Sequence, residues 1–171
     1  MQRILLIVVS FIAITFTNLN AANFKAAFSD PALWNGKIVP EEMVCSNYNF
    51  DSGSTPEITL SNIPKKTDKI ILVFSDETFK PMSDGGHGII SYRIDPGLKT
   101  IIIPSMQGET FDLPDEFTSL IPHKGVQFGK AEGAYLAPCS GGKKNTYSVI
   151  IQAVDKDNNV LDSTSLTLGK F

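Results

Sequence analysis

The sequence predicts a mostly-β domain, built as an antiparallel β-sandwich. Several short stretches either alternate polar and apolar residues or form brief apolar runs rich in β-branched side chains, as strands do. Loops rich in Gly, Pro, Asp and Ser separate these stretches. No long amphipathic helix, internal repeat or linker interrupts the series, so we expect one domain with one or two short helices.

The first expected strand is Glu57–Ser61, which alternates polar and apolar residues. Lys69–Ser75 is a continuous apolar run, typical of a strand that is covered on both faces. Similar runs follow at Gly88–Ile94, Thr100–Ile103, Tyr147–Val154 and Val160–Leu168. The last two flank a turn-like segment, Asp155–Asn159, and therefore predict a hairpin with a five-residue loop.

One short helix is expected over Leu113–Ile121. Its first residues would be Pro114, Asp115 and Glu116. Proline fits the first turn of a helix, and acidic side chains there interact favourably with the helix dipole.

The first 22 residues predict a secretory signal peptide outside the folded domain. Arg3 gives a positive start, Ile4–Phe16 is apolar apart from two hydroxyl residues, and Ala21 and Ala22 offer a small-residue cleavage site. The apolar stretch is short for a membrane span, which needs about 20 residues, and an uncleaved anchor is the alternative. We expect cleavage after Ala21 or Ala22, which leaves residues 23–171 as one domain, without a membrane span, in the periplasm or the medium.

Charge and cysteine content exclude several classes of protein. The 171 residues include 15 basic and 18 acidic ones. Loss of Arg3 with the signal peptide would give a net charge of 14 − 18 = −4. A negative net charge does not favour binding to the phosphates of nucleic acid. Two cysteines are too few for a four-cysteine zinc site or a disulfide-dense miniprotein. In an oxidising compartment Cys45 and Cys139 could form one disulfide, and two free buried thiols are the alternative.

The common enzyme signatures are absent. There is no G-x-S-x-G, H-E-x-x-H or C-x-x-C motif, and His87 and His123 are the only histidines, so we expect no catalytic residue, no metal site and no cofactor. Gly125–Lys130 is similar to a phosphate-binding loop, but it lacks one spacer residue. Ala131 also stands where the magnesium-binding hydroxyl would be. We therefore interpret this segment as unrelated to nucleotide binding.

The first candidate site lies between two expected strands. Asp76 lies at the C-terminal edge of the expected strand Lys69–Ser75, and His87 lies at the start of the next one, so antiparallel neighbours could place both side chains at one sheet edge. Glycines around His87 leave the backbone bare, and a ligand could approach it closely. A surface turn with a structural histidine is the simpler alternative.

The second candidate site is the glycine-rich loop Ala137–Tyr147. Gly141 and Gly142 can expose successive backbone N–H groups, and Lys143 and Lys144 add positive charge. Such a loop can hold an anion, although an ordinary exposed turn would have the same composition.

A series of segments matches one family's motifs in order. These segments are Ile38–Pro40 followed by Cys45, Ser54–Ile58, Asn62–Pro64, Ile71–Asp76, His87–Ile94, Ala134–Cys139 and Tyr147. The series resembles the phosphatidylethanolamine-binding protein family, in particular a secreted member of its bacterial Raf kinase inhibitor-like branch. The likeness covers most of the chain beyond the expected signal peptide.

The resemblance implies a β-sandwich with a large central antiparallel sheet and a small surface cavity that binds phosphate and similar anions. It also implies that Asp76 and His87 belong to this cavity, with the imidazole donating to phosphate oxygens and the carboxylate accepting from an ammonium group. Tyr147 would add a hydroxyl or an aromatic wall. The expected partner is therefore a small anionic or phosphate-containing ligand. The second loop would contribute Gly141, Gly142, Lys143 and Lys144.

The sequence departs from the family pattern around this cavity. The differing positions are Glu77, Thr78, Gly86, Gly88, Asn145 and Thr146, where the family has proline, aspartate, two tryptophans, histidine and arginine. We therefore expect a wider and more polar pocket, in which Lys143 or Lys144 could supply the lost positive charge.

Three functions are compatible with the sequence. The leading one is an exported, non-enzymatic binding protein with a small anion pocket. The second is a protein-interaction or inhibitor module that uses the segment Leu113–Gly125 and the loop rims. The weakest is a phosphoester hydrolase with Asp76 and His87 as an acid–base pair.

Overall fold

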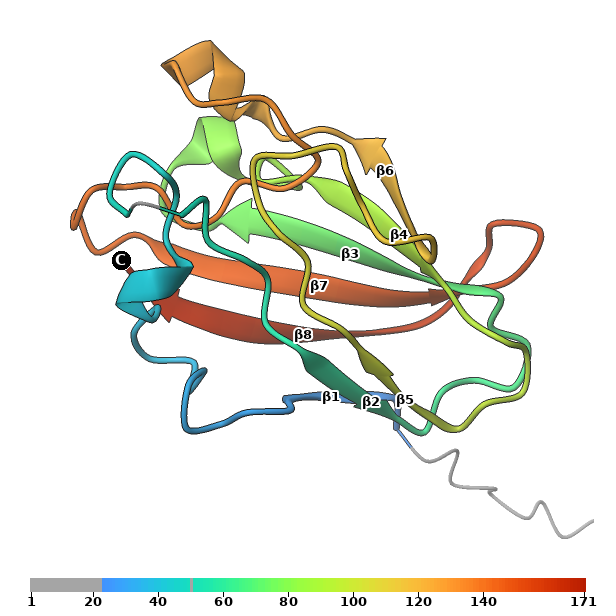
Figure 1. The fold of residues 1–171 in the computed structure, drawn as a ribbon. Coiled ribbons are helices and arrows are strands. Elements are labelled where there is room, and N and C mark those ends of the chain that lie inside the picture. The colour runs from blue at the N-terminus through green and yellow to red at the C-terminus, as the bar shows by residue number, and fades with distance from the viewer. Residues whose placement is uncertain (1–22, 50) are drawn as a thin grey trace, which may run out of the picture.

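The computed structural model describes residues 23–49 and 51–171, which form two antiparallel sheets packed face to face (Figure 1). The smaller sheet has the strand order β1-β2-β5, and the larger has the order β6-β4-β3-β7-β8. The predicted signal peptide lies outside the described residues. The strands are β1 (Lys25–Phe28), β2 (Ile58–Ser61), β3 (Lys69–Asp76), β4 (Ile89–Arg93), β5 (Thr100–Ile103), β6 (Phe117–Ile121), β7 (Thr146–Val154) and β8 (Val160–Lys170).

All six strands expected from the sequence are confirmed, and so is the mostly-β antiparallel sandwich with a large sheet. The β7–β8 hairpin has the expected loop Asp155–Asn159, because β7 ends at Val154 and β8 begins at Val160. One carboxylate oxygen of Asp155 accepts the backbone N–H groups of Asp157 and Asn159, at 2.9 and 2.8 Å. Strands β1 and β6 were not expected.

The predicted helix over Leu113–Ile121 is wrong. Its acidic start forms a turn in which Phe117 N–H donates to Pro114 O at 2.9 Å, and β6 then pairs with β4. The ring of Phe117 is buried against Tyr92, with 4.9 Å between centroids. Burial of this ring and the cross-strand pairing outweigh the helix-compatible first turn. The helical elements described are three short 3₁₀ helices: η1 (Glu41–Met43), η2 (Lys80–Met82) and η3 (Lys124–Phe128).

The hydrophobic core lies between the two sheets. The core-facing side chains of the strands include Ile58, Leu60 and Ile103 from the small sheet and Ile70, Leu72, Phe74, Val149 and Ile151 from the large one. Strand β3 lies at the centre of the large sheet, but only one of its faces is fully covered, because Ile71 and Val73 on the other face are partly exposed. The expectation of two covered faces is therefore met on one face only.

Strand register brings the candidate residues to one end of the large sheet. Asp76, the last residue of β3, lies opposite Tyr147 of β7. On the other side of β3, His87 N–H donates to Phe74 O at 3.0 Å, so His87 also lies at this end. Figure 1 shows the loops before β4 and before β7 at the same end, opposite the β7–β8 hairpin.

A disulfide joins Cys45 to Cys139, with a Cα–Cα distance of 5.3 Å, and thereby decides between the two alternatives for these cysteines. It ties the segment after η1 to the loop before β7, across a sequence separation of 94. Closing a loop of this length stabilises the folded state by at most about 4–5 kcal/mol in the chain-entropy treatment.

Within the described ranges, no helix is both long and apolar enough to cross a membrane.

Candidate functional site

A pocket of about 370 Å³ opens at this end of the large sheet. We call four of its buried or half-buried polar lining residues the floor: Asp76, His87, Asn145 and Tyr147. Ser140, also half-buried, lines the pocket beside them. We call five further lining residues the rim: Tyr48, Phe79, Phe128 and Lys143, which are exposed, and Lys130, which is half-buried.

The pocket brings together four of the seven predicted ligand-binding residues. Asp76, His87, Tyr147 and Lys143 line it, so the two candidate loops meet at one cavity. The other predicted residues of the second loop, Gly141, Gly142 and Lys144, do not line the cavity.

His87 is held in one tautomer by the backbone. Its Nδ1 lies 2.7 Å from Leu136 O, and a carbonyl oxygen can only accept, so Nδ1 carries the proton of the neutral ring. The side chain is only 3% exposed, and burial lowers the pKa of His87 to about 4. At neutral pH the ring is therefore uncharged, and Nε2 holds a lone pair that can accept a hydrogen bond.

Asp76 links the two loops that form the pocket. Its Oδ1 accepts the backbone N–H groups of Thr78 and Phe79 at 2.8 and 2.9 Å, which fixes the turn that follows β3. Its Oδ2 accepts from Asn145 Nδ2 at 2.6 Å, across the pocket floor. All three partners are neutral donors, so they hold the carboxylate in place without cancelling its charge.

Several positions that depart from the family pattern contact one another. Besides the Asp76–Asn145 bond, Thr146 N–H donates to Thr78 Oγ1 at 2.9 Å, and Glu77 N–H donates to Thr146 O at 2.8 Å. The unusual residues of the first loop therefore pair with the unusual residues of the second. These three bonds hold the two loops together on the pocket side of the sheet.

The glycines beside His87 do not open the backbone to a ligand, and that expectation is wrong. A Cβ on Gly86 would lie 2.3 Å from Met82 Cα, and one on Gly88 would lie 2.2 Å from Ala134 O. Gly88 also has a φ of +117°, a region that favours glycine. These glycines allow neighbouring segments of the chain to approach closely.

Tyr147 forms one side of the floor. Its ring meets the His87 ring edge-on, with centroids 5.2 Å apart and an interplanar angle of 84°. Its hydroxyl accepts from Cys139 N–H at 3.2 Å, and burial raises the pKa of Tyr147 to about 12. The tyrosine therefore stays protonated at neutral pH, and its position depends on the disulfide-linked loop.

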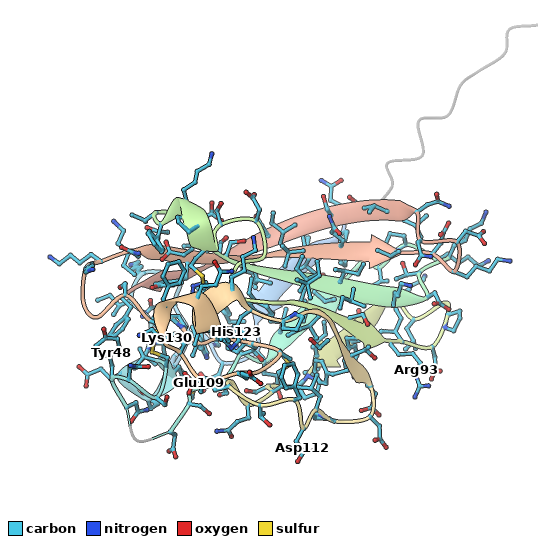
Figure 2. All side chains as sticks on the ribbon, turned by 90° about the horizontal axis from the view of Figure 1, so that it is seen from above. Tyr48, Arg93, Glu109, Asp112, His123 and Lys130 are labelled. Atoms are coloured by element: carbon cyan, nitrogen blue, oxygen red, sulfur yellow. A yellow bond between two sulfur atoms is a disulfide. The ribbon has the colours of Figure 1, made fainter. Side chains whose placement is uncertain are left out.

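The rim was mostly missed by sequence reasoning. Lys130 Nζ lies 5.7 Å from the centre of the Tyr48 ring, and Figure 2 shows these two residues near each other. Phe79 and Phe128 meet at 5.4 Å between ring centroids. Tyr48, Phe128 and Lys130 come from segments without a motif, and Phe128 and Lys130 belong to the stretch that only superficially resembles a phosphate loop.

The positive charge of the rim is not neutralised by any carboxylate of the described residues. In the part of the chain that the structure describes, neither Lys130 nor Lys143 forms an ion pair with a carboxylate.

Across residues 23–49 and 51–171, no group of three or more His, Cys, Asp or Glu side chains is placed to hold a metal ion.

Comparisons with known proteins support the fold. No family model matches the chain, and no curated protein matches it. Among solved structures, E. coli YbcL, reported as a new member of the mammalian PEBP family, has a TM-score of 0.53 and 16% sequence identity to this chain. The match covers 88% of this chain and 98% of YbcL. The chain therefore has the fold of the phosphatidylethanolamine-binding proteins.

Proposed function

We propose that this protein is an exported, non-enzymatic binding protein whose pocket holds a small ligand through an anionic group, such as a phosphate-bearing head group. The observation that carries the proposal is a pocket of about 370 Å³ with two lysines at its rim, Lys130 and Lys143, that form no ion pair among the described residues. An anion at the rim could receive charge-assisted hydrogen bonds from both. The aromatic rim residues would cover the rest of the ligand.

Export is supported by the disulfide between Cys45 and Cys139, because such bonds persist in oxidising compartments. The signal-peptide pattern of the first residues points the same way.

Binding is favoured over hydrolysis by the way Asp76 and His87 are used. Asp76 holds two loops together through its hydrogen bonds. His87 Nδ1 donates to the backbone carbonyl of Leu136, whereas in a catalytic acid–base pair this nitrogen would donate to a carboxylate. No hydrogen bond joins the two side chains among the contacts of the described residues.

The test is calorimetric titration of the purified protein with inorganic phosphate and with phosphoethanolamine. We expect saturable binding of at least one of them, and a loss of about tenfold or more in affinity when Lys130 and Lys143 are both replaced by alanine. Lys156→Ala, in the β7–β8 hairpin at the opposite end of the sheet, is the matched control and should bind normally. If neither ligand at millimolar concentration gives a saturable binding heat, the proposal is refuted.

A protein-interaction module is the second candidate, favoured by the edge strand β6. Leu120 and Ile121 are 46% and 48% exposed, and β6 is the outermost strand on its side of the large sheet. An exposed apolar edge can pair with a strand of another protein. Such pairing would slow hydrogen exchange of the β6 amides in a mixture with exported proteins. Unchanged exchange there would count against this function.

A further inference from the structure

We propose that the pocket floor selects a protonated amine or another hydrogen-bond-donating cation, while the anionic group of the same ligand remains at the lysine rim. This inference rests on the proposed binding function and adds the chemical class that the floor accepts. It agrees with the resemblance in placing an ammonium group at Asp76, and it differs in excluding the anion from His87.

The first argument is the charge of the floor. The carboxylate of Asp76 is 3% exposed and is held only by the Thr78, Phe79 and Asn145 N–H groups. It forms no ion pair in the described ranges, so its negative charge is not neutralised. A phosphate entering the floor would meet this charge in a setting that water screens poorly, whereas an ammonium group would be attracted.

The second argument is the hydrogen-bonding role of His87. Its single N–H is used by Leu136 O, at 2.7 Å. The remaining nitrogen, Nε2, is therefore an acceptor that suits an N–H or O–H donor and repels a phosphate oxygen. Asp76 and His87 thus favour the same kind of ligand group.

The third argument is the separation of charge within the pocket. The cationic side chains that line it are Lys143, which is exposed, and Lys130, which is half-buried, whereas Asp76 in the floor is 3% exposed. The Tyr147 ring, which packs edge-on against His87, adds an aromatic surface beside the floor and also suits a cation. A ligand with an amine and an acidic group would therefore enter with its amine first.

The experiment is an NMR titration at pH 7 with three probes: ethanolamine hydrochloride, inorganic phosphate and phosphoethanolamine. Reporters of the floor are the His87 ring nitrogens and the Asn145 side-chain amide, and the reporter of the rim is the Lys143 backbone amide. We expect ethanolamine to shift the floor signals saturably, phosphate to shift only the rim, and phosphoethanolamine to shift both.

The variant Asn145→Lys tests the cause. Its ammonium group would pair with Asp76 Oδ2, while the two backbone N–H bonds to Oδ1 remain. We expect ethanolamine to bind about tenfold more weakly or worse, and phosphate to begin to shift His87. Asn23→Lys adds the same charge at an exposed position before β1, away from the pocket, and should leave both probes unchanged.

The outcomes separate this inference from the proposed function. If phosphate shifts the rim but ethanolamine does not shift the floor, the inference fails and the binding function stands. If phosphate shifts His87 or Asn145 in the natural sequence, or if Asn145→Lys binds ethanolamine normally, the inference also fails. If none of the three probes shifts any signal, both proposals fail. Should Asn145→Lys not fold, the probe series on the natural sequence still decides.

Discussion

Lowering the pH should destabilise the fold through His87. Its pKa is about 4 in the folded protein and 6.5 in an unfolded chain, so the unfolded state binds more protons between these two values. Stability from this group is fully present above pH 6.5 and is lost as the pH falls towards 4. The difference of about 2.5 units, at 1.36 kcal/mol per unit, corresponds to roughly 3 kcal/mol of unfolding free energy.

The assay is urea unfolding at steps of pH from 7.5 to 4, comparing the natural sequence with His87→Asn. The Asn side-chain amide can replace the Nδ1–H donor to Leu136 O but does not titrate. His123, whose pKa is also lowered by burial, and all the carboxylates are common to both proteins. The difference between the two pH profiles therefore isolates His87.

The reasoning would be refuted if the two profiles ran parallel within about 1 kcal/mol from pH 7.5 to 4. An NMR titration of His87 with a midpoint near 6.5 would refute it independently, because a solvated imidazole would then occupy the pocket floor.

Two further predictions concern the framework of the pocket. Replacing Cys45 and Cys139 by serine should lower the free energy of unfolding, measured with urea, by about 2–5 kcal/mol. If the protein is equally stable without the disulfide, closing the loop across the sequence separation of 94 contributes nothing to stability. Gly88→Ala should lower the melting temperature far more than Gly97→Ala. Both glycines have a positive φ, but only at position 88 would the new Cβ lie 2.2 Å from Ala134 O. Equal effects of the two substitutions would show that the close contact with Ala134 does not matter.

The strands were predictable from the sequence where burial imposes a local pattern. The stretches that became β2, β3 and β7 show alternation or apolar runs, and the Asp155–Asn159 turn shows its own chemistry. Strand β1, Lys25–Phe28, has two adjacent alanines and no β-branched residue, so it shows neither alternation nor a β-rich run. Strand β6 follows a proline and two acidic residues that also suit a helix, and only its pairing with β4 decides between the two structures.

The floor of the site was predictable for a different reason. Asp76 ends β3, Tyr147 is the second residue of β7, and His87 lies two residues before β4, so antiparallel pairing brings them together. The rim residues Tyr48 and Lys130 come from irregular segments that are placed by distant contacts, such as the disulfide. Their position could not be read from local sequence, because it depends on the packing of the whole domain.

The register between β3 and β7 also has a consequence for how the protein folds. Asp76 and Tyr147 are direct partners although 147 − 76 = 71 residues separate them along the chain. Such pairings close long loops before they gain any contact energy, and domains dominated by them fold in milliseconds to seconds. The two halves of the pocket floor therefore meet only when this slow pairing is complete. During folding, the ability to bind a ligand should appear together with the central sheet, and not before it.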